Sequence, residues 1–225
     1  MIEAVVEGCQ GRATVDGDAA RLSLGCYELF GGDAASPGAR RLVAEAARPR
    51  ELVYGNDPAW RELILAVFGD GVFDRPMLDY DAAGLDDATL DRFVAALPAG
   101  FALRPFDLDL AGQLDTELEP HGLQVFASAA DLAEHGLGIA IVRDGRLACA
   151  ATSYTRSSRH AEVAIATRPA WRGQGLAAVA AAAFMRECRR LGLVPCWSAS
   201  NPISQRLALR LGYRVAGPCE VLFRR

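Results

Sequence analysis

The chain has 225 residues, 51% of them hydrophobic, and a net charge of −4. This length suffices for one large domain or two small ones with a sizeable core, and no apolar run reaches the roughly 20 residues of a membrane-spanning helix. The start Met1-Ile2-Glu3 lacks the basic residues of a secretory leader, and no basic stripe alternates with aromatic residues. We therefore expect a cytoplasmic protein that binds neither a membrane nor nucleic acid.

Charged residues are unevenly distributed along the chain. Residues 1–100 contain 17 acids and 9 arginines, giving −8, whereas residues 101–225 contain 11 acids and 15 arginines, giving +4. The positive half suits a polyanionic ligand. All 24 basic residues are arginine, which excludes a Schiff-base lysine and indicates GC-rich coding, hence a bacterial source. The six cysteines show neither C-x-x-C nor zinc-ligand spacing, so we expect free thiols and no metal site.

The first hundred residues predict a small α/β unit without a catalytic motif. Strands are expected at 3–6, 12–15, 21–24, 51–54 and 75–80, and helices at 36–47, from 56 onward and at 86–97. Ser36-Pro37 and Asp57-Pro58 are typical of helix starts. The stretch Pro98-Ala99-Gly100 then predicts a boundary between domains at 1–98 and 99–225.

The second unit shows a clearer succession of elements. A strand is expected at 101–106, followed by helical segments over 107–135 with a break near Pro120-His121-Gly122. Asp144-Gly145 predicts a tight hairpin turn between two strands. The expected elements around and after it are strands at 138–143, 146–154 and 162–167, an alanine-rich helix from 176 that Gly192 ends, a strand at 194–200, a helix at 202–211, and strands at 213–215 and 220–223.

A glycine loop joins the 162–167 strand to the alanine-rich helix. The loop reads Arg172-Gly173-Gln174-Gly175. The first N–H groups of a helix have no internal partner, and the helix dipole adds about half a positive charge there, so such a loop suits a phosphate. A Walker loop would need a lysine and a dinucleotide fingerprint a third glycine, and both are missing here. The alternative is a loop that only turns the strand into the helix.

Two segments resemble the motifs of the GNAT acetyltransferases. The segment 172–177 is similar to the core of their acyl-CoA pyrophosphate motif, [QR]-x-x-G-x-[GA], although Ala170 stands at its first position. The segment 201–213 is similar to N-x-x-[AS]-x-x-L-[YA]-x-x-x-G-[FY], and the expected elements from residue 101 follow the order of the GNAT fold. The first unit resembles, more weakly, the degenerate partner domain of two-domain bacterial GNAT proteins. The resemblance implies an α/β (α+β) fold whose mixed central sheet contains a splayed pair of parallel strands.

The resemblance also implies where acetyl-CoA binds. Backbone groups of Ile165, Ala166 and Thr167 would pair with the pantetheine amides. The N–H groups of the loop would hold the pyrophosphate, and the residues concerned are Arg172, Gly173, Gln174, Gly175, Leu176 and Ala177. Asn201 matches a position that often contacts the cofactor, and it also suits a helix N-cap before Pro202.

Acetyl transfer to an amine needs a general base. A lysine-like amine with a pKa near 10.4 is neutral in only about 1 in 2,500 molecules at pH 7. Glu162 occupies the strand position where many GNAT enzymes carry a glutamate base; the alternatives are an exposed strand carboxylate there and His160 as the base. Ala208 stands where many members have a tyrosine acid, so Ser204 and Tyr154 are the remaining candidates for protonating the CoA thiolate.

The expected activity is direct transfer of an acetyl group from acetyl-CoA to the primary amine of a small molecule. Two other functions remain open: a non-catalytic acyl-CoA-binding module that has lost the tyrosine, and an acetyltransferase for proteins or peptides. The resemblance assigns the acceptor pocket to residues 107–136 and 155–160, which carry no recognisable motif. The first unit could shape that pocket or form a homodimer contact.

Overall fold

The computed structural model describes residues 1–225 except 47–49, 55–56, 76, 115–117, 119–124 and 225. Its elements in the first hundred residues are α1 (Ile2–Val6), β1 (Arg12–Asp16), β2 (Ala19–Leu24), β3 (Tyr27–Gly32), α2 (Pro37–Ala44), β4 (Arg50–Val53), α3 (Pro58–Phe68), η1 (Gly69–Gly71), β5 (Val72–Asp74), β6 (Met77–Asp81), η2 (Ala82–Gly84) and α4 (Asp87–Ala95). The side chains of Ser36 and Asp57 accept hydrogen bonds from N–H groups in the first turns of α2 and α3, so both predicted helix starts are confirmed.

The later elements are β7 (Ala102–Pro105), α5 (Leu108–Gln113), α6 (Ala129–His135), β8 (Gly138–Arg143), β9 (Arg146–Arg156), β10 (His160–Thr167), η4 (Pro169–Trp171), α7 (Leu176–Arg190), β11 (Val194–Ala199), α8 (Pro202–Leu211), β12 (Arg214–Cys219) and β13 (Val221–Arg224). Asp144 and Gly145 both have positive φ, 51° and 75°, as the predicted tight turn between β8 and β9 requires. The break expected near Pro120-His121-Gly122 lies outside the described residues.

The strand predicted at residues 3–6 is wrong, because this segment forms α1. The carboxylates of Glu3 and Glu7 both bind the loop between β9 and β10. Residues four apart lie on one face of a helix, whereas in an extended strand they would lie about 13 Å apart. The helical spacing therefore lets both carboxylates reach one loop, a long-range contact that the local sequence does not reveal.

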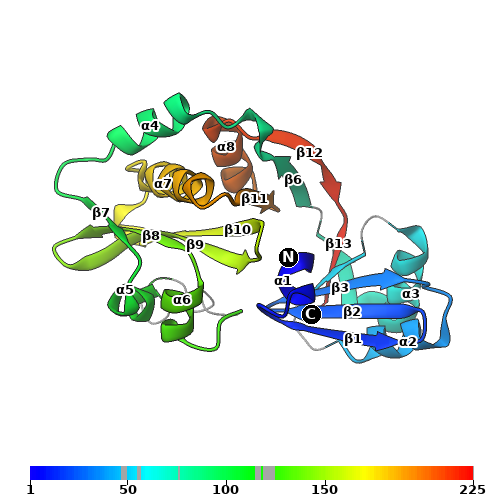
Figure 1. The fold of residues 1–225 in the computed structure, drawn as a ribbon. Coiled ribbons are helices and arrows are strands. Elements are labelled where there is room, and N and C mark those ends of the chain that lie inside the picture. Colours follow the sequence, from blue (N-terminus) through cyan, green and yellow to red (C-terminus); the bar gives the residue numbers. More distant parts are fainter. Residues whose placement is uncertain (47–49, 55–56, 76, 115–117, 119–124, 225) are drawn as a thin grey trace.

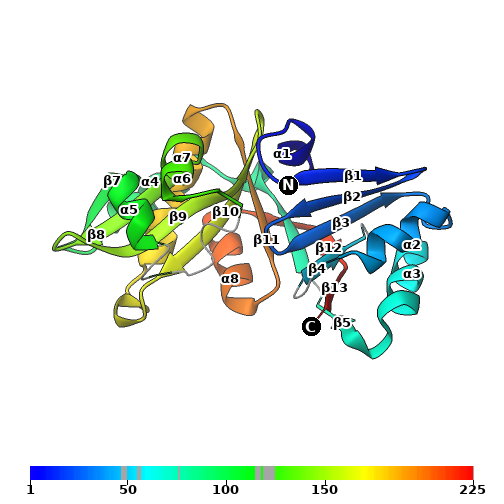
Figure 2. The same cartoon turned by 90° about the horizontal axis from the view of Figure 1, so that it is seen from below.

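The strands form two mixed sheets with helices packed against them, which confirms the predicted fold class (Figure 1). Among the described residues, one sheet has the order β1-β2-β3-β4-β13-β5 and the other β12-β6-β11-β10-β9-β8-β7. In the second sheet α7 covers one face, while α5 and α6 lie on the opposite face. In the view from below, α2 and α3 pack beside the first sheet (Figure 2).

Two strands cross the boundary predicted at residue 98. Strand β6 comes from the first hundred residues but pairs with β11 and β12 in the second sheet. Strand β13, near the C-terminus, lies between β4 and β5 in the first sheet. Helix α4 also packs on α7, with Arg186 of α7 paired to Asp91 of α4 at 3.1 Å. The two sheets are therefore assembled from interleaved stretches of the chain.

The alanine-rich sequence of α7 fits its place against the second sheet. Ala180, Ala181 and Ala182 are fully buried, and Phe184 and Met185 complete the same core. Small side chains let a helix approach a sheet closely without leaving voids. The first sheet has a separate core with α2 and α3, in which Trp60 stacks on Phe30 with ring centroids 5.4 Å apart.

We expect Leu222→Ala to lower the free energy of unfolding by about 2–5 kcal/mol. Leu222 lies in β13, is 1% exposed and belongs to the core of the first sheet. Val215→Ala in β12 is the matched control, because Val215 is 52% exposed, and we expect a change within about 0.5 kcal/mol. Denaturant unfolding followed by circular dichroism measures both; equal effects would contradict the assignment of β13 to that core.

Candidate active site

The predicted pair of splayed strands is present as β10 and β11. Their parallel pairing starts at His160 and ends where Glu162 faces Cys196. Beyond that point β10 continues to Thr167 beside β9, with a bulge between Glu162 and Val163. Strand β11 instead pairs on its other side with β6 from Trp197 onward. The strands therefore part at Glu162, and among the described residues no strand pairs with the β11-facing edge of residues 163–167.

Glu162 lies at the point where the two strands part. Its Oε1 accepts one hydrogen bond from the Ser198 N–H at 2.9 Å and another from the Ser198 hydroxyl at 2.8 Å. Burial raises the pKa of the Glu162 carboxyl, and this effect is stronger than the opposing effect of the Ser198 hydroxyl. A carboxylate with a raised pKa is a stronger base than an exposed one, so this environment suits a group that accepts a proton.

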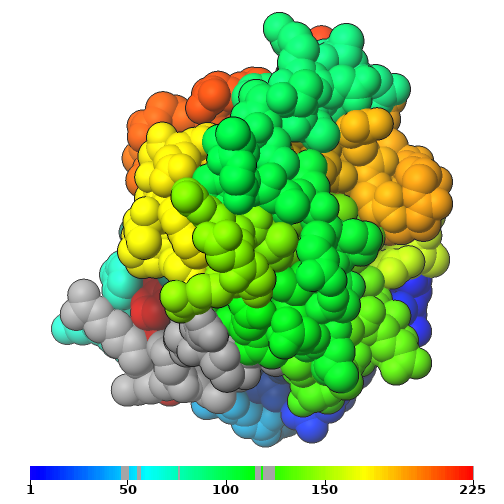
Figure 3. All heavy atoms as spheres, turned by 90° about the vertical axis from the view of Figure 1, so that its left-hand side faces the viewer, coloured from blue at the N-terminus to red at the C-terminus, as the bar shows by residue number. Residues whose placement is uncertain are grey.

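The glycine loop at the end of β10 has the geometry of an anion site. Gly173 and Gly175 have φ values of 79° and 80°, in the left-handed region that favours glycine. A Cβ at either position would meet no other atom within 4 Å. Helix α7 starts at Leu176, and its N-cap residue is Gly175, which has no side chain to cap the helix. The exposed loop, coloured yellow, reaches the surface in Figure 3. Its glycines and the first N–H groups of α7 are therefore accessible to a phosphate.

The other residues predicted for the cofactor lie at the two sides of the opening. Ile165, Ala166 and Thr167 belong to the stretch of β10 that pairs with β9 but no longer with β11, and the Arg172 Nε donates to the Thr167 carbonyl at 3.1 Å. Asn201 is the N-cap of α8, directly after β11, and its Oδ1 accepts from the Ser204 N–H at 2.9 Å. The loop and Asn201 thus follow the two strands that part.

Both candidates for the general acid already have hydrogen-bond partners. The Ser204 hydroxyl accepts from the Trp197 Nε1–H at 3.0 Å. The Tyr154 hydroxyl accepts from the Cys26 N–H at 3.2 Å, and burial raises the pKa of this phenol. Among the described residues, no hydrogen bond joins either hydroxyl to Glu162. The structure therefore does not bring the three predicted catalytic side chains into one hydrogen-bonded set.

The turn between β2 and β3 packs against Tyr154. The Tyr27 ring meets the Tyr154 ring edge-on, with centroids 5.7 Å apart. A Cβ on Gly25 would lie 2.1 Å from the Tyr154 hydroxyl, so this close approach requires glycine. The first sheet thus reaches β9 next to the bulge at Glu162. Nothing in the local sequence indicated this contact, since Cys26 and Tyr154 are 128 residues apart.

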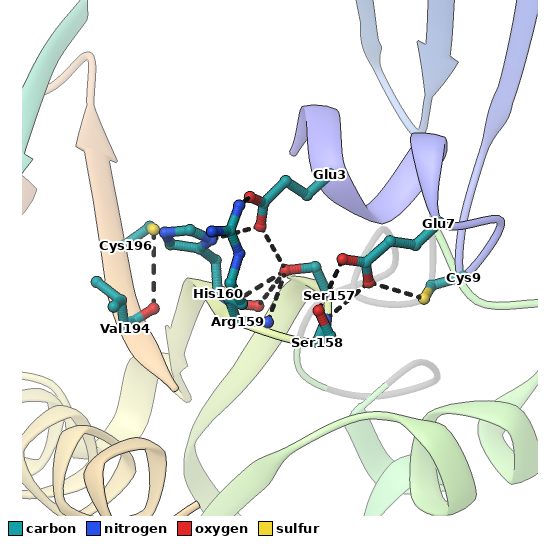
Figure 4. A network of polar contacts seen from close by, with 9 residues as sticks. All are labelled: Glu3, Glu7, Cys9, Ser157, Ser158, Arg159, His160, Val194 and Cys196. Atoms are coloured by element: carbon teal, nitrogen blue, oxygen red, sulfur yellow. Dashed lines mark hydrogen bonds and ion pairs between the residues drawn. The ribbon is translucent and has the colours of Figure 1, made fainter. Parts of the chain in front are cut away.

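His160, the second candidate base, is held by α1. Its Nδ1 lies 2.5 Å from Glu3 Oε2, which also accepts from the Ser157 hydroxyl at 3.1 Å (Figure 4). Arg159 adds an ion pair to Glu3. The hydrogen bond from His160 is the largest cause that lowers the pKa of Glu3, to about 2. His160 therefore contributes to docking α1 on the loop between β9 and β10.

Two polar residues beside Glu162 were not among the predicted site residues. Ser198 binds Glu162 directly, and Asp79 of β6 lies opposite Ser198 in the antiparallel pairing of β6 with β11. The only available signal for Ser198 was its place in the strand before Asn201. Asp79 could not be found without knowing that β6 joins the second sheet.

The described residues contain no helix with the length and apolar character needed to span a bilayer. They also contain no group of three or more histidine, cysteine, aspartate or glutamate residues arranged to hold a metal ion.

Comparisons with known proteins agree with this geometry. A family model described as GNAT acetyltransferase matches residues 1–222. An uncharacterized N-acetyltransferase, YdfB of Bacillus subtilis (strain 168), is 29% identical over 120 residues; the match covers 52% of this chain but only 46% of that relative. The chain thus spans about half the length of this curated relative.

Solved structures show the same fold over nearly the whole chain. A GCN5-related N-acetyltransferase-like protein from Streptococcus suis 89/1591 has a TM-score of 0.86 and 27% identity, covering 99% of this chain and 91% of its own. A GCN5-related N-acetyltransferase from Kribbella flavida has a TM-score of 0.67 and 19% identity, covering 99% and 94%; this likeness shows the fold alone. With the family model matched from residue 1 to 222, the chain belongs to the GNAT acetyltransferase family.

Proposed function

We propose that this enzyme transfers the acetyl group of acetyl-CoA directly to the primary amine of a small molecule. The observation that carries the proposal is the parting of β10 and β11 at Glu162, a partly buried carboxylate with a raised pKa. The accessible glycine loop at the end of β10 would add a phosphate site beside the gap between β10 and β11. One opening could thus hold a thioester between a phosphate site and a base.

The backbone and the loop would bind acetyl-CoA. The β11-facing edge of β10 at Ile165, Ala166 and Thr167 would offer backbone groups to the pantetheine amides, and the Arg172 side chain would first have to release the Thr167 carbonyl. The N–H groups of residues 172–177 would hold the pyrophosphate, where the α7 dipole favours negative charge. Asn201 would contact the cofactor from the other strand, in addition to capping α8.

Glu162 would act as the general base in a ternary complex. It accepts the proton that the amine loses as the new C–N bond forms and the thioester C–S bond breaks. The sulfur leaves as a thiolate, which is tolerable without a strong acid because a thiol pKa is only about 8.5. Ser204 and Tyr154 remain the candidates for returning a proton to it, because each hydroxyl accepts a hydrogen bond in the structure and an accepting hydroxyl still carries its own proton.

A titration of acetyl-CoA into the purified protein, followed by calorimetry, tests this proposal. Dephospho-CoA and NAD serve as controls for a less specific phosphate site. We expect binding in the micromolar range for acetyl-CoA, and release of free thiol when a panel of small primary amines is added. Absence of acetyl-CoA binding would mean that the 172–177 loop only connects β10 to α7.

A further inference from the structure

Three polar residues lie side by side on adjacent strands of the second sheet. Glu162 is on β10, Ser198 on β11 and Asp79 on β6. Ser198 bridges the row, since it binds Glu162 directly and faces Asp79 across the antiparallel pairing. Residues directly opposite each other in such a pair project to the same face of the sheet. The two carboxylates thus lie on one face with a hydroxyl between them.

The hydrogen bonds distinguish the two oxygens of Glu162. Both bonds from Ser198 end on Oε1, at 2.8 and 2.9 Å. Among the residues that the structure describes, none hydrogen-bonds to Oε2. One oxygen is therefore fixed by two donors, and the rotation of the carboxylate is fixed with it. The second oxygen retains its lone pairs for a donor that is not part of the described chain.

We infer that Ser198 is a positioning residue that fixes Oε1 of Glu162 and leaves Oε2 to take the proton of the acceptor amine, and that Asp79 strengthens this base from the far side of β11. The inference rests on the proposed function, because it assigns Glu162 the role of base. Asp79 owes this position to β6, which the first hundred residues contribute to the second sheet. That part of the chain would therefore contribute directly to the strength of the base.

The electrostatic surroundings of Glu162 agree with this division of roles. Burial has the largest effect on the pKa of Glu162 and raises it. The hydrogen bond from the Ser198 hydroxyl lowers this pKa, and the negative charge of Asp79 raises it. The positive charge of the Met1 amino group also lowers the pKa of this carboxyl. Four other titratable groups among the described residues also interact with this carboxyl: Tyr27 on β3, Cys196 on β11, Cys219 on β12, and Tyr213 just before β12.

These four neighbours are uncharged at neutral pH. Burial raises the pKa of the Cys196 and Cys219 thiols to about 11 each, and it also raises the pKa of the two tyrosines. Asp79 is the side chain of the row that brings a second negative charge to the base. Removing the Ser198 hydroxyl and removing the Asp79 charge should therefore move the Glu162 pKa in opposite directions.

A pH titration of the Glu162 side-chain carboxyl by ¹³C NMR tests the inference without a substrate. The resonance is assigned by its loss in Glu162→Gln. We expect a higher pKa in Ser198→Ala, because one donor to the carboxylate is lost, and a lower pKa in Asp79→Asn, because a neighbouring negative charge is lost. Ser198→Thr keeps a hydroxyl and should return the pKa toward that of the wild type.

Enzyme turnover is the second measurement. It distinguishes a failure of this inference from a failure of the proposed function. With acetyl-CoA and an amine from the thiol-release screen, Ser198→Ala should lower kcat/KM roughly fivefold on the acid side, which corresponds to one hydrogen bond. Shifts in the same direction, or no shift, in Ser198→Ala and Asp79→Asn would overturn the inference while leaving the proposed function intact. Full turnover in Glu162→Gln would overturn the role of Glu162 as base, and with it this inference, whereas a wild type that releases no thiol with any amine would overturn the proposed function itself.

Discussion

Replacing Glu162 by Gln is expected to lower kcat at least about a hundredfold while the affinity for acetyl-CoA stays unchanged. Glutamine has nearly the same shape and can still accept hydrogen bonds from Ser198 through its carbonyl oxygen. It cannot accept the amine proton, so only the chemical step is affected. Thiol release measures kcat, and calorimetry with acetyl-CoA measures the affinity.

Glu62→Gln is the matched control for this substitution. Glu62 is an exposed residue on α3, which packs on the first sheet, and the chemical change is the same. We expect wild-type turnover and wild-type affinity from it. Unchanged turnover in Glu162→Gln would show that another group serves as base. A wild-type protein that binds acetyl-CoA without acetylating any amine would instead favour the non-catalytic module. The sequence had suggested that alternative because Ala208 stands where many family members have a tyrosine.

The elements predicted well are those whose signal is local. Asp144-Gly145 fits the positive φ angles of a tight hairpin, and Asn201 caps α8 through the Ser204 N–H, only three residues away. Gly192 follows the end of α7 with a φ of 72°. In each case the determining interaction spans a few residues, so the sequence pattern and the structural cause coincide.

The features that sequence did not reveal depend on contacts between distant segments. The pairing of β6 with β11 joins Asp79 to Ser198, and α1 forms through contacts more than 150 residues away. Neither feature changes the local pattern of apolar and polar residues. The position of Glu162 could be predicted from a family motif, but its hydrogen bonds to Ser198 depend on the register between two strands, which only the folded sheet defines.

The hydrogen-bond partners of Tyr154 and Ser204 could not be predicted from the local sequence either. Sequence suggested them as acids because they carry hydroxyls near the expected opening. In the structure the Tyr154 hydroxyl accepts a hydrogen bond from the Cys26 N–H, and the Ser204 hydroxyl accepts one from the Trp197 side chain. A hydroxyl's partner depends on which segment packs against it, and here one of those segments is the turn between β2 and β3. Their catalytic role stays a prediction.

The second large effect is expected from Gly175→Asp, which should weaken acetyl-CoA binding at least about a hundredfold. Gly175 precedes α7 in the left-handed region, which aspartate tolerates better than most residues, so the backbone can keep its conformation. The new carboxylate would occupy the open space above the loop, where we place the pyrophosphate. Like charges repel there, and the side chain takes the volume that glycine leaves open.

Gly192→Asp is the control, because Gly192 follows the other end of the same helix. Its φ is 72°, against 80° for Gly175, and a Cβ there also meets no atom within 4 Å. Both substitutions therefore impose a similar backbone cost, while only Gly175→Asp brings a negative charge to the predicted phosphate site. Calorimetry should show a loss of acetyl-CoA binding for Gly175→Asp alone. Equal affinities in the two variants would exclude this loop from binding the cofactor, since the chemical change and the backbone conformation are matched.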